Sequence, residues 1–148
     1  MDVPLSVLAK SLSGFTICHF KDINHDPKAP AHFYVTVPIN DDLSLLLCVI
    51  TSQIENRVRY YHKTNERAID ALVQVDKKDL PFLDKVSVIE CNQPVLIRRN
   101  EMDKIIDPKH KFKIICRDIP RDLKEKIVSA INKSPIVKPF IKKMLIKP

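Results

Sequence analysis

Five histidines are the side chains of this sequence best suited to acid-base chemistry, because imidazole titrates near neutral pH. His19 and His110 have no neighbours in the sequence that would assist catalysis, and we interpret them as structural or solvated. His25 lies in an expected loop between two strands, and its role stays open. His32 is the strongest candidate for a general base or acid. It opens a predicted strand directly after the proline-bounded segment 27–30, where a side chain can face a groove.

Two hydroxyl groups and an amide follow the apolar run at 45–50. Thr51, Ser52 and Gln53 come where a buried strand is expected to end, and strand ends display binding residues on a rigid scaffold. Thr51 is therefore a candidate binding residue, with Ser52 and Gln53 beside it. The same residue types also form ordinary turns by bonding to the local backbone, and their spacing does not decide between the two roles.

The next segment, 53–67, is expected to be a loop; it interleaves cationic and aromatic side chains and holds two of the chain's three tyrosines. Arginines bind phosphates and tyrosines stack on bases, so this composition suits single-stranded RNA. A solvated hairpin whose tyrosines pack on a sheet has the same composition, and both interpretations stay open. The candidate residues for binding RNA are Arg57, Arg59, Tyr60, Tyr61 and Lys63.

Several kinds of site are absent from the sequence. Gly14 is the only glycine, which excludes the glycine-rich loops of dinucleotide-binding folds and phosphate-binding P-loops. The acidic residues and histidines show no metal-ligand spacing, so we expect neither a metal nor a cofactor. The four cysteines form no C-x-x-C pair and stand among apolar residues, which favours buried reduced thiols. They are Cys18, Cys48, Cys91 and Cys116.

The charge of the chain is unevenly distributed. The formal net charge is +7, and residues 117–148 hold nine Lys and Arg against three Asp and Glu. This asymmetry favours a polyanion or an acidic protein as partner, although a basic helix can also be merely solvated. The longest apolar run, 45–50, is far shorter than the roughly 20 residues that span a bilayer. The acidic start, Met1-Asp2-Val3-Pro4, does not resemble a secretory signal, so we expect a cytoplasmic protein without membrane contact.

The elements that must position these residues are mainly strands. Six short runs rich in β-branched or aromatic residues are bounded by Pro, Asn or Asp, and no long helix separates them. This pattern predicts antiparallel pairing in a small barrel or a strongly bent sheet. The run at 45–50 lacks alternation, which predicts a central strand covered on both faces. The six predicted strands are 15–20, 32–37, 44–51, 71–76, 86–91 and 112–116.

Helices are expected at both ends of the chain. A short helix should end near Ser13-Gly14, a turn or two of helix is expected at 101–106, and Ile119-Pro120 should open a longer one. Its apolar stripe is Leu123, Ile127, Ala130 and Ile131. A basic amphipathic stretch, 136–145, is interrupted by Pro139 and could be a separate electrostatic arm or part of the core. We expect a single domain, with an N-terminal helix in 1–13, a β-barrel in 14–117 and a basic helical segment in 118–148.

Five segments in a fixed order carry a family resemblance. A strand begins at Gly14, a second strand follows a proline-containing loop, and a third ends in an Ile-Thr-Ser turn. A Lys-x-Ser-Val-Ile stretch and a Gln come later. The segments are Gly14–Phe20, His32–Val37, Ile50–Ser52, Lys85–Ile89 and Gln93. In this order and spacing, residues 14–132 resemble the PemK/MazF family of toxin endoribonucleases.

This resemblance implies an SH3-like β-barrel, a homodimer that binds single-stranded RNA across its groove, and metal-independent cleavage. It also implies a cognate antitoxin with an acidic, peptide-like segment as partner. The family's threonine corresponds to Thr51. The family's Arg-Pro pair at the opening of the second strand is replaced by Ala31-His32. Either His32 acts with an arginine from elsewhere, such as Arg57 or Arg59, or the protein binds RNA or a partner without cutting.

The sequence thus favours a metal-independent endoribonuclease that works by attack of the RNA 2′-hydroxyl on the adjacent phosphate. His32 would transfer the proton, Thr51 would bind the scissile phosphate, and Arg57 would stabilise the developing charge. The alternative is a non-catalytic SH3-like module that binds RNA or protein through the same surface.

Overall fold

The structure of the protein is a computed structural model that describes residues 4–148. Residues 1–3, which contribute to the expectation of no secretory signal, lie outside the described residues. Within 4–148, no helix has the length and apolar character needed to cross a membrane.

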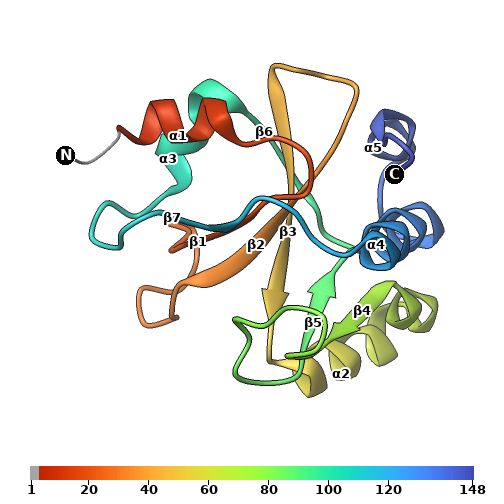
Figure 1. The fold of residues 1–148 in the computed structure, drawn as a ribbon. Coiled ribbons are helices and arrows are strands. Elements are labelled where there is room, and N and C mark those ends of the chain that lie inside the picture. The colour runs from red at the N-terminus through yellow and green to blue at the C-terminus, as the bar shows by residue number, and fades with distance from the viewer. Residues whose placement is uncertain (1–3) are drawn as a thin grey trace.

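A sheet of seven strands forms the centre of the fold, and all of its pairings are antiparallel. The strand order is β4-β5-β3-β2-β1-β7, and β6 pairs with the first half of β3 (Figure 1). All six predicted strands are confirmed to within two residues of their bounds, whereas β6 was not predicted. The strands are β1 (Ile17–Phe20), β2 (His32–Val37), β3 (Ser44–Thr51), β4 (Leu72–Val75), β5 (Ser87–Glu90), β6 (Val95–Arg98) and β7 (Lys113–Cys116).

The longest strand, β3, is buried on both faces, as its unbroken apolar run predicted. Leu46 and Cys48 belong to one core cluster, whereas the alternate residues Leu45 and Leu47 belong to a second cluster across the sheet. Because successive side chains of a strand point to opposite faces, a strand between two cores needs apolar residues at every position. Two cores therefore explain why β3 lacks alternation.

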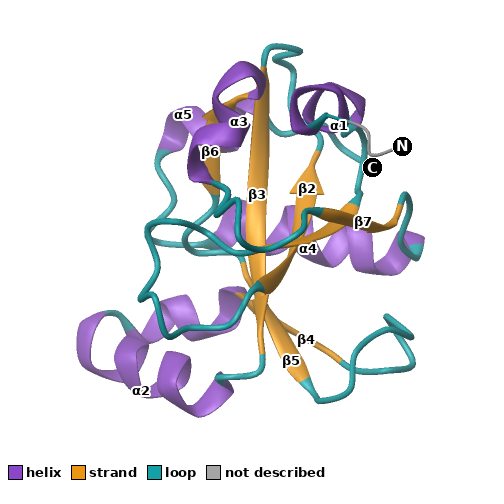
Figure 2. Ribbon diagram, turned by 90° about the vertical axis from the view of Figure 1, so that its left-hand side faces the viewer, coloured by secondary structure: helices purple, strands orange, loops and turns teal. Residues whose placement is uncertain are grey.

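Helices cover the two faces of the sheet (Figure 2). The first core contains buried residues of α4 (Arg121–Lys133) and α5 (Pro139–Met144). The second contains residues of α1 (Leu5–Ser11) and α3 (Met102–Ile105). All four helices were predicted, but Pro139 does not interrupt the last one. It occupies the first turn of α5, where its missing N–H costs no hydrogen bond.

The segment interpreted as a loop or hairpin at 53–67 is instead helical, and that prediction was wrong. It forms α2 (Ile54–Thr64), followed by a 3₁₀ helix at Glu66–Ala71. Ile54, Val58 and Tyr61 recur at four- and three-residue spacing, and no proline or glycine interrupts them. The high polarity of the segment concealed this helical periodicity.

A mainly antiparallel β protein with C-terminal helices is confirmed, but the sheet is open. β4 and β7 stand at its two ends, and each pairs with a single strand. β3 pairs along one edge with β6 at Ser44–Leu47 and with β5 at Ile50 and Thr51. Two different partners along one edge require the sheet to diverge there, which places β4 and β5 at one end of the molecule (Figure 1).

Candidate functional site

His32 and Thr51 lie at the same end of two adjacent central strands, β2 and β3. Phe33 in β2 pairs with Ile50 in β3, so the next residues outward, His32 and Thr51, are neighbours across the two strands. Phe33 and Ile50 pack with the first core, and side chains alternate along a strand. His32 and Thr51 therefore share the opposite face, as expected for two groups that act on one substrate.

A cleft of about 400 Å³ opens at this end of β2 and β3. Its lining includes four of the site residues proposed from the sequence: His32, Thr51, Ser52 and Gln53. The cleft also contains Asp84 and Lys85, which sequence analysis did not identify as site residues. They arrive there because β5 pairs with the end of β3, with Thr51 opposite Val88. The sequence identifies the Lys-x-Ser stretch only as part of the family resemblance. Its place in the cleft follows from the long-range pairing of β5 with β3.

The surroundings of His32 favour the neutral form of its imidazole. Burial lowers the pKa of its imidazole, and the positive charges of His25, Lys21 and Arg57 lower it further. The ring nitrogen Nδ1 is buried without a hydrogen-bond partner. The other nitrogen, Nε2, is therefore the one through which His32 could exchange a proton with a substrate. A neutral imidazole in a cationic surrounding is suited to accept a proton close to an anion.

Two of the charged groups around His32 come from the loop between β1 and β2. Lys21 is only 2% exposed, and its ammonium donates a hydrogen bond to the carbonyl oxygen of Asp26 at 2.7 Å. The ring of His25 lies edge-on to that of His32, with 5.7 Å between centroids. The charge of Lys21 thus acts on His32, a role that sequence analysis did not assign to Lys21.

The Thr51 side chain takes part in the turn that leads into α2. Its Oγ1 accepts a hydrogen bond from the backbone N–H of Gln53 at 3.1 Å, so the local turn role considered for Thr51 is present. The hydroxyl hydrogen remains available to donate to a ligand. Ser52 is exposed, and Gln53 precedes the first turn of α2, whose backbone N–H groups carry partial positive charge. The strand end therefore presents donors to the cleft.

Arg57 and Tyr61, one turn apart on α2, both contact Glu90 of β5. Tyr61 donates to Glu90 Oε2 at 2.8 Å, and Arg57 Nη1 lies 3.5 Å from the same oxygen. Tyr61 and Glu90 are fully buried. The candidate role of Tyr61 in stacking on RNA bases is therefore wrong, because no base can reach a ring enclosed between α2 and the sheet. Arg57 keeps 32% of its side chain exposed, and its charge acts on His32.

The other cationic and aromatic candidates lie on the outer side of α2. Arg59 and Lys63 border a shallow depression beside Val58, separate from the cleft at His32. Tyr60 is 50% exposed, with its ring 5.1 Å from that of Tyr61. Helix formation in this segment divides the residues between two surfaces, so only Arg57 is close enough to influence His32.

A metal site within residues 4–148 would need several converging ligands. No group of three His, Cys, Asp or Glu side chains in this part of the chain is arranged to hold a metal ion. Cys18, Cys48 and Cys91 are buried and Cys116 is half-buried, all in reduced form. Comparison of the sequence and structure with protein-family models, with curated proteins and with solved structures gave no match.

Proposed function

We propose that the protein is a metal-independent endoribonuclease of the PemK/MazF kind, acting on single-stranded RNA as the toxin of a toxin-antitoxin system. The observation that carries the proposal is the cleft before α2 in which His32 stands beside Thr51 at the ends of two paired strands. The open sheet that builds the cleft would be a divergent form of the family's SH3-like barrel.

Each group in the cleft has a role in such a reaction. Nε2 of His32 accepts the proton of the RNA 2′-hydroxyl, whose oxygen attacks the adjacent phosphorus. The bond from phosphorus to the 5′-oxygen breaks, water protonates the departing oxygen, and a 2′,3′-cyclic phosphate and a 5′-hydroxyl remain. Thr51 donates to a phosphate oxygen, and Arg57 supports the extra negative charge of the transition state.

The surroundings of the cleft are suited to RNA. Ser52, Gln53 and Lys85 border it with hydrogen-bond donors and a positive charge. Three side chains of α2 are exposed and could contact the RNA beyond the cleft: Arg59, Tyr60 and Lys63. An acidic, peptide-like segment of a cognate antitoxin would compete for the same cationic groups. We also propose a homodimer, whose solution mass would be twice the 17.1 kDa of one chain.

The deciding experiment incubates the purified protein with labelled single-stranded RNA in EDTA and identifies the product ends. We expect fragments with 2′,3′-cyclic phosphate and 5′-hydroxyl ends. His32→Gln and Thr51→Val should each slow cleavage by about 100-fold or more, the usual size for proton transfer and phosphate positioning. His62→Gln, at an exposed position on α2, is the matched control and should cut like the wild type.

The binding-module alternative has one observation in its favour. Arg57, which would have to replace the arginine missing before His32, is partly engaged by the buried carboxylate of Glu90. If the wild type binds RNA but does not cut it, this alternative replaces the nuclease. If His32→Gln cuts as fast as His62→Gln, the assignment of the base is wrong.

A further inference from the structure

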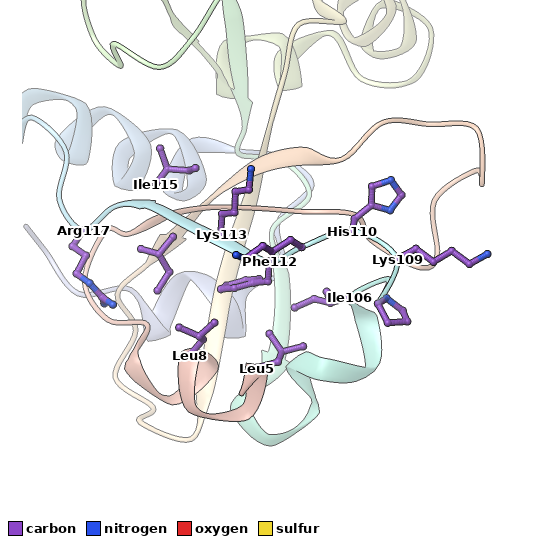
Figure 3. A pocket seen from close by; sticks show the side chains of 12 residues that line it. Leu5, Leu8, Ile106, Lys109, His110, Phe112, Lys113, Ile115 and Arg117 are labelled. Carbon is purple, nitrogen blue, oxygen red and sulfur yellow. The ribbon is translucent and has the colours of Figure 1, made fainter. Parts of the chain in front are cut away.

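A long groove runs along β7, between this edge strand and α1 (Figure 3). Its volume is about 1080 Å³, and it shares no residue with the cleft at His32. Successive residues 112–115 all line it. Because side chains alternate along a strand, a groove lined by four successive residues follows the strand's edge rather than one face.

The edge of β7 is unpaired on this side within residues 4–148. β7 pairs with β1 alone, through Ile17, Cys18 and His19, and it ends the strand order of the sheet. An edge strand carries backbone N–H and C=O groups that can pair with a further strand. Exposed edges of this kind favour an extended peptide as the ligand.

The side chains of the groove are apolar on one face and cationic around it. Phe112 and Ile114 belong to the core cluster that also includes Leu5 and Leu8 of α1. Figure 3 shows Phe112 on the side of these leucines and Lys113 on the opposite side. Among the described residues, the rim carries the cationic side chains of Lys109, Lys113 and Arg117, His110 lies 3.7 Å from Asp107, and no acidic residue lines the groove itself.

From this geometry we infer that the groove binds an extended acidic peptide, which adds to β7 as a further strand. Its alternate apolar side chains lie against Leu5, Leu8 and Phe112, and its acidic side chains meet the cationic rim. The apolar floor distinguishes this partner from RNA, because a sugar-phosphate backbone would leave the floor uncovered. This site is independent of the proposed nuclease cleft.

The first test measures binding of a labelled, capped peptide of about eight residues that alternates Val and Glu. We expect saturable binding below about 1 mM, at least tenfold tighter than that of a peptide alternating Val and Lys. Lys109→Glu with Lys113→Glu should weaken it at least tenfold. Lys77→Glu with Lys78→Glu makes the same charge change at exposed positions in the turn after β4 and should leave binding unchanged.

The second test asks whether the peptide pairs with the strand. Successive N–H groups of a strand point to opposite edges, so one Val/Glu peptide is N-methylated on its valines and another on its glutamates. Strand addition predicts that one of them loses binding while the other keeps it. The unmodified peptide should also slow hydrogen exchange of the amides at 113–116.

Four results would overturn the inference. They are an absence of saturable peptide binding, equal effects of the two double charge reversals, equal behaviour of the two methylated peptides, and unchanged exchange along β7. Binding of single-stranded RNA or phosphatidylserine vesicles at this rim, without binding of the peptide, would assign the groove to a different class of ligand and would also refute the inference.

Discussion

The hydroxyl of Tyr61 donates a hydrogen bond to the carboxylate of Glu90 at 2.8 Å, and neither side chain is exposed to solvent. The other oxygen, Glu90 Oε1, accepts from the backbone N–H of Asn92 at 2.9 Å and from its side-chain amide at 3.0 Å. Burial of a carboxylate is unfavourable unless such donors surround it. The Tyr61 bond therefore attaches α2 to β5 and fixes the helix that carries Arg57.

Replacing Tyr61 by Phe should destabilise the fold. The Glu90 carboxylate would stay buried with one donor fewer, which costs about 1–3 kcal/mol. Urea unfolding measures the loss of stability. Tyr60→Phe removes the same atom from a half-exposed ring and serves as the control, with a change below about 0.5 kcal/mol.

The comparison of the two variants decides whether the buried hydroxyl of Tyr61 contributes to stability. Equal stability of the Tyr61→Phe and Tyr60→Phe proteins would show that the buried bond to Glu90 contributes nothing.

The strands were predictable because their signal is local. Each predicted strand consists of β-branched or aromatic residues between turn-forming residues, and no distant partner is needed to recognise that pattern. α2 escaped prediction for the opposite reason. Its apolar positions are few, and the hydrogen-bond partner of buried Tyr61 is Glu90, 29 residues further along the chain.

The candidate site shows the same division. His32 and Thr51 could be chosen from the sequence because each stands at the end of a local pattern. Lys85 joins them only through the pairing of β3 with β5, and Lys21 only through the burial of its own side chain. Pairing partners and the burial of charged groups depend on contacts between distant segments, which the local pattern of a single sequence does not contain.

The C-terminal segment should behave as part of the core and not as a free electrostatic arm. Val137 and Ile141 are buried in the first core, and the backbone N–H of Asn40 donates to the carbonyl oxygen of Met144 at 2.9 Å. Burying such side chains stabilises by about 1.5–3 kcal/mol each. Removal of residues 135–148 should therefore lower the melting temperature by about 5 °C or more.

A matched variant separates packing from charge in this segment. Lys138→Gln with Lys143→Gln removes two charges from exposed positions and leaves the apolar residues in place. Its melting temperature should stay within about 2 °C of the wild type. An unchanged melting temperature after the truncation, with a weaker salt dependence of RNA binding, would restore the electrostatic arm.

The cysteines should differ sharply in reactivity. Burial raises the pKa of the Cys18 thiol to about 12, and a hydrogen bond with Cys48 together with burial raises the pKa of the Cys91 thiol. Burial raises the pKa of the Cys116 thiol as well, but this side chain is only half-buried and a reagent can reach it. Because the thiolate is the reactive form, a thiol reagent should modify Cys116 first and the other three only after unfolding. Cys116→Ser should abolish the early reaction, and a second thiol that reacts in the folded protein would contradict this order.

The stability of the fold should decrease below about pH 6.5 in part through His32. Burial and the neighbouring charges lower the pKa of its imidazole in the folded state, so the unfolded chain binds a proton more readily. When the folded state binds fewer protons, stability falls as the pH drops below the unfolded pKa, and the loss is complete below the folded pKa. Burial lowers the pKa of His19 too, so His32 accounts for only part of the decrease.

Urea unfolding of wild type and His32→Gln at about pH 7.5 and pH 5 measures this contribution. We expect a smaller loss of stability between the two pH values in the variant, because one proton-binding difference has been removed. His62→Gln controls for the loss of an exposed histidine. RNA cleavage provides a second readout, since a base with a lowered pKa stays unprotonated further into the acidic range than free imidazole does. Two results together would contradict this account: cleavage that is lost already near pH 6.5, and the same pH dependence of stability in His32→Gln and wild type. They would show that the pKa of His32 is not lowered in the fold and that His32 is not the base.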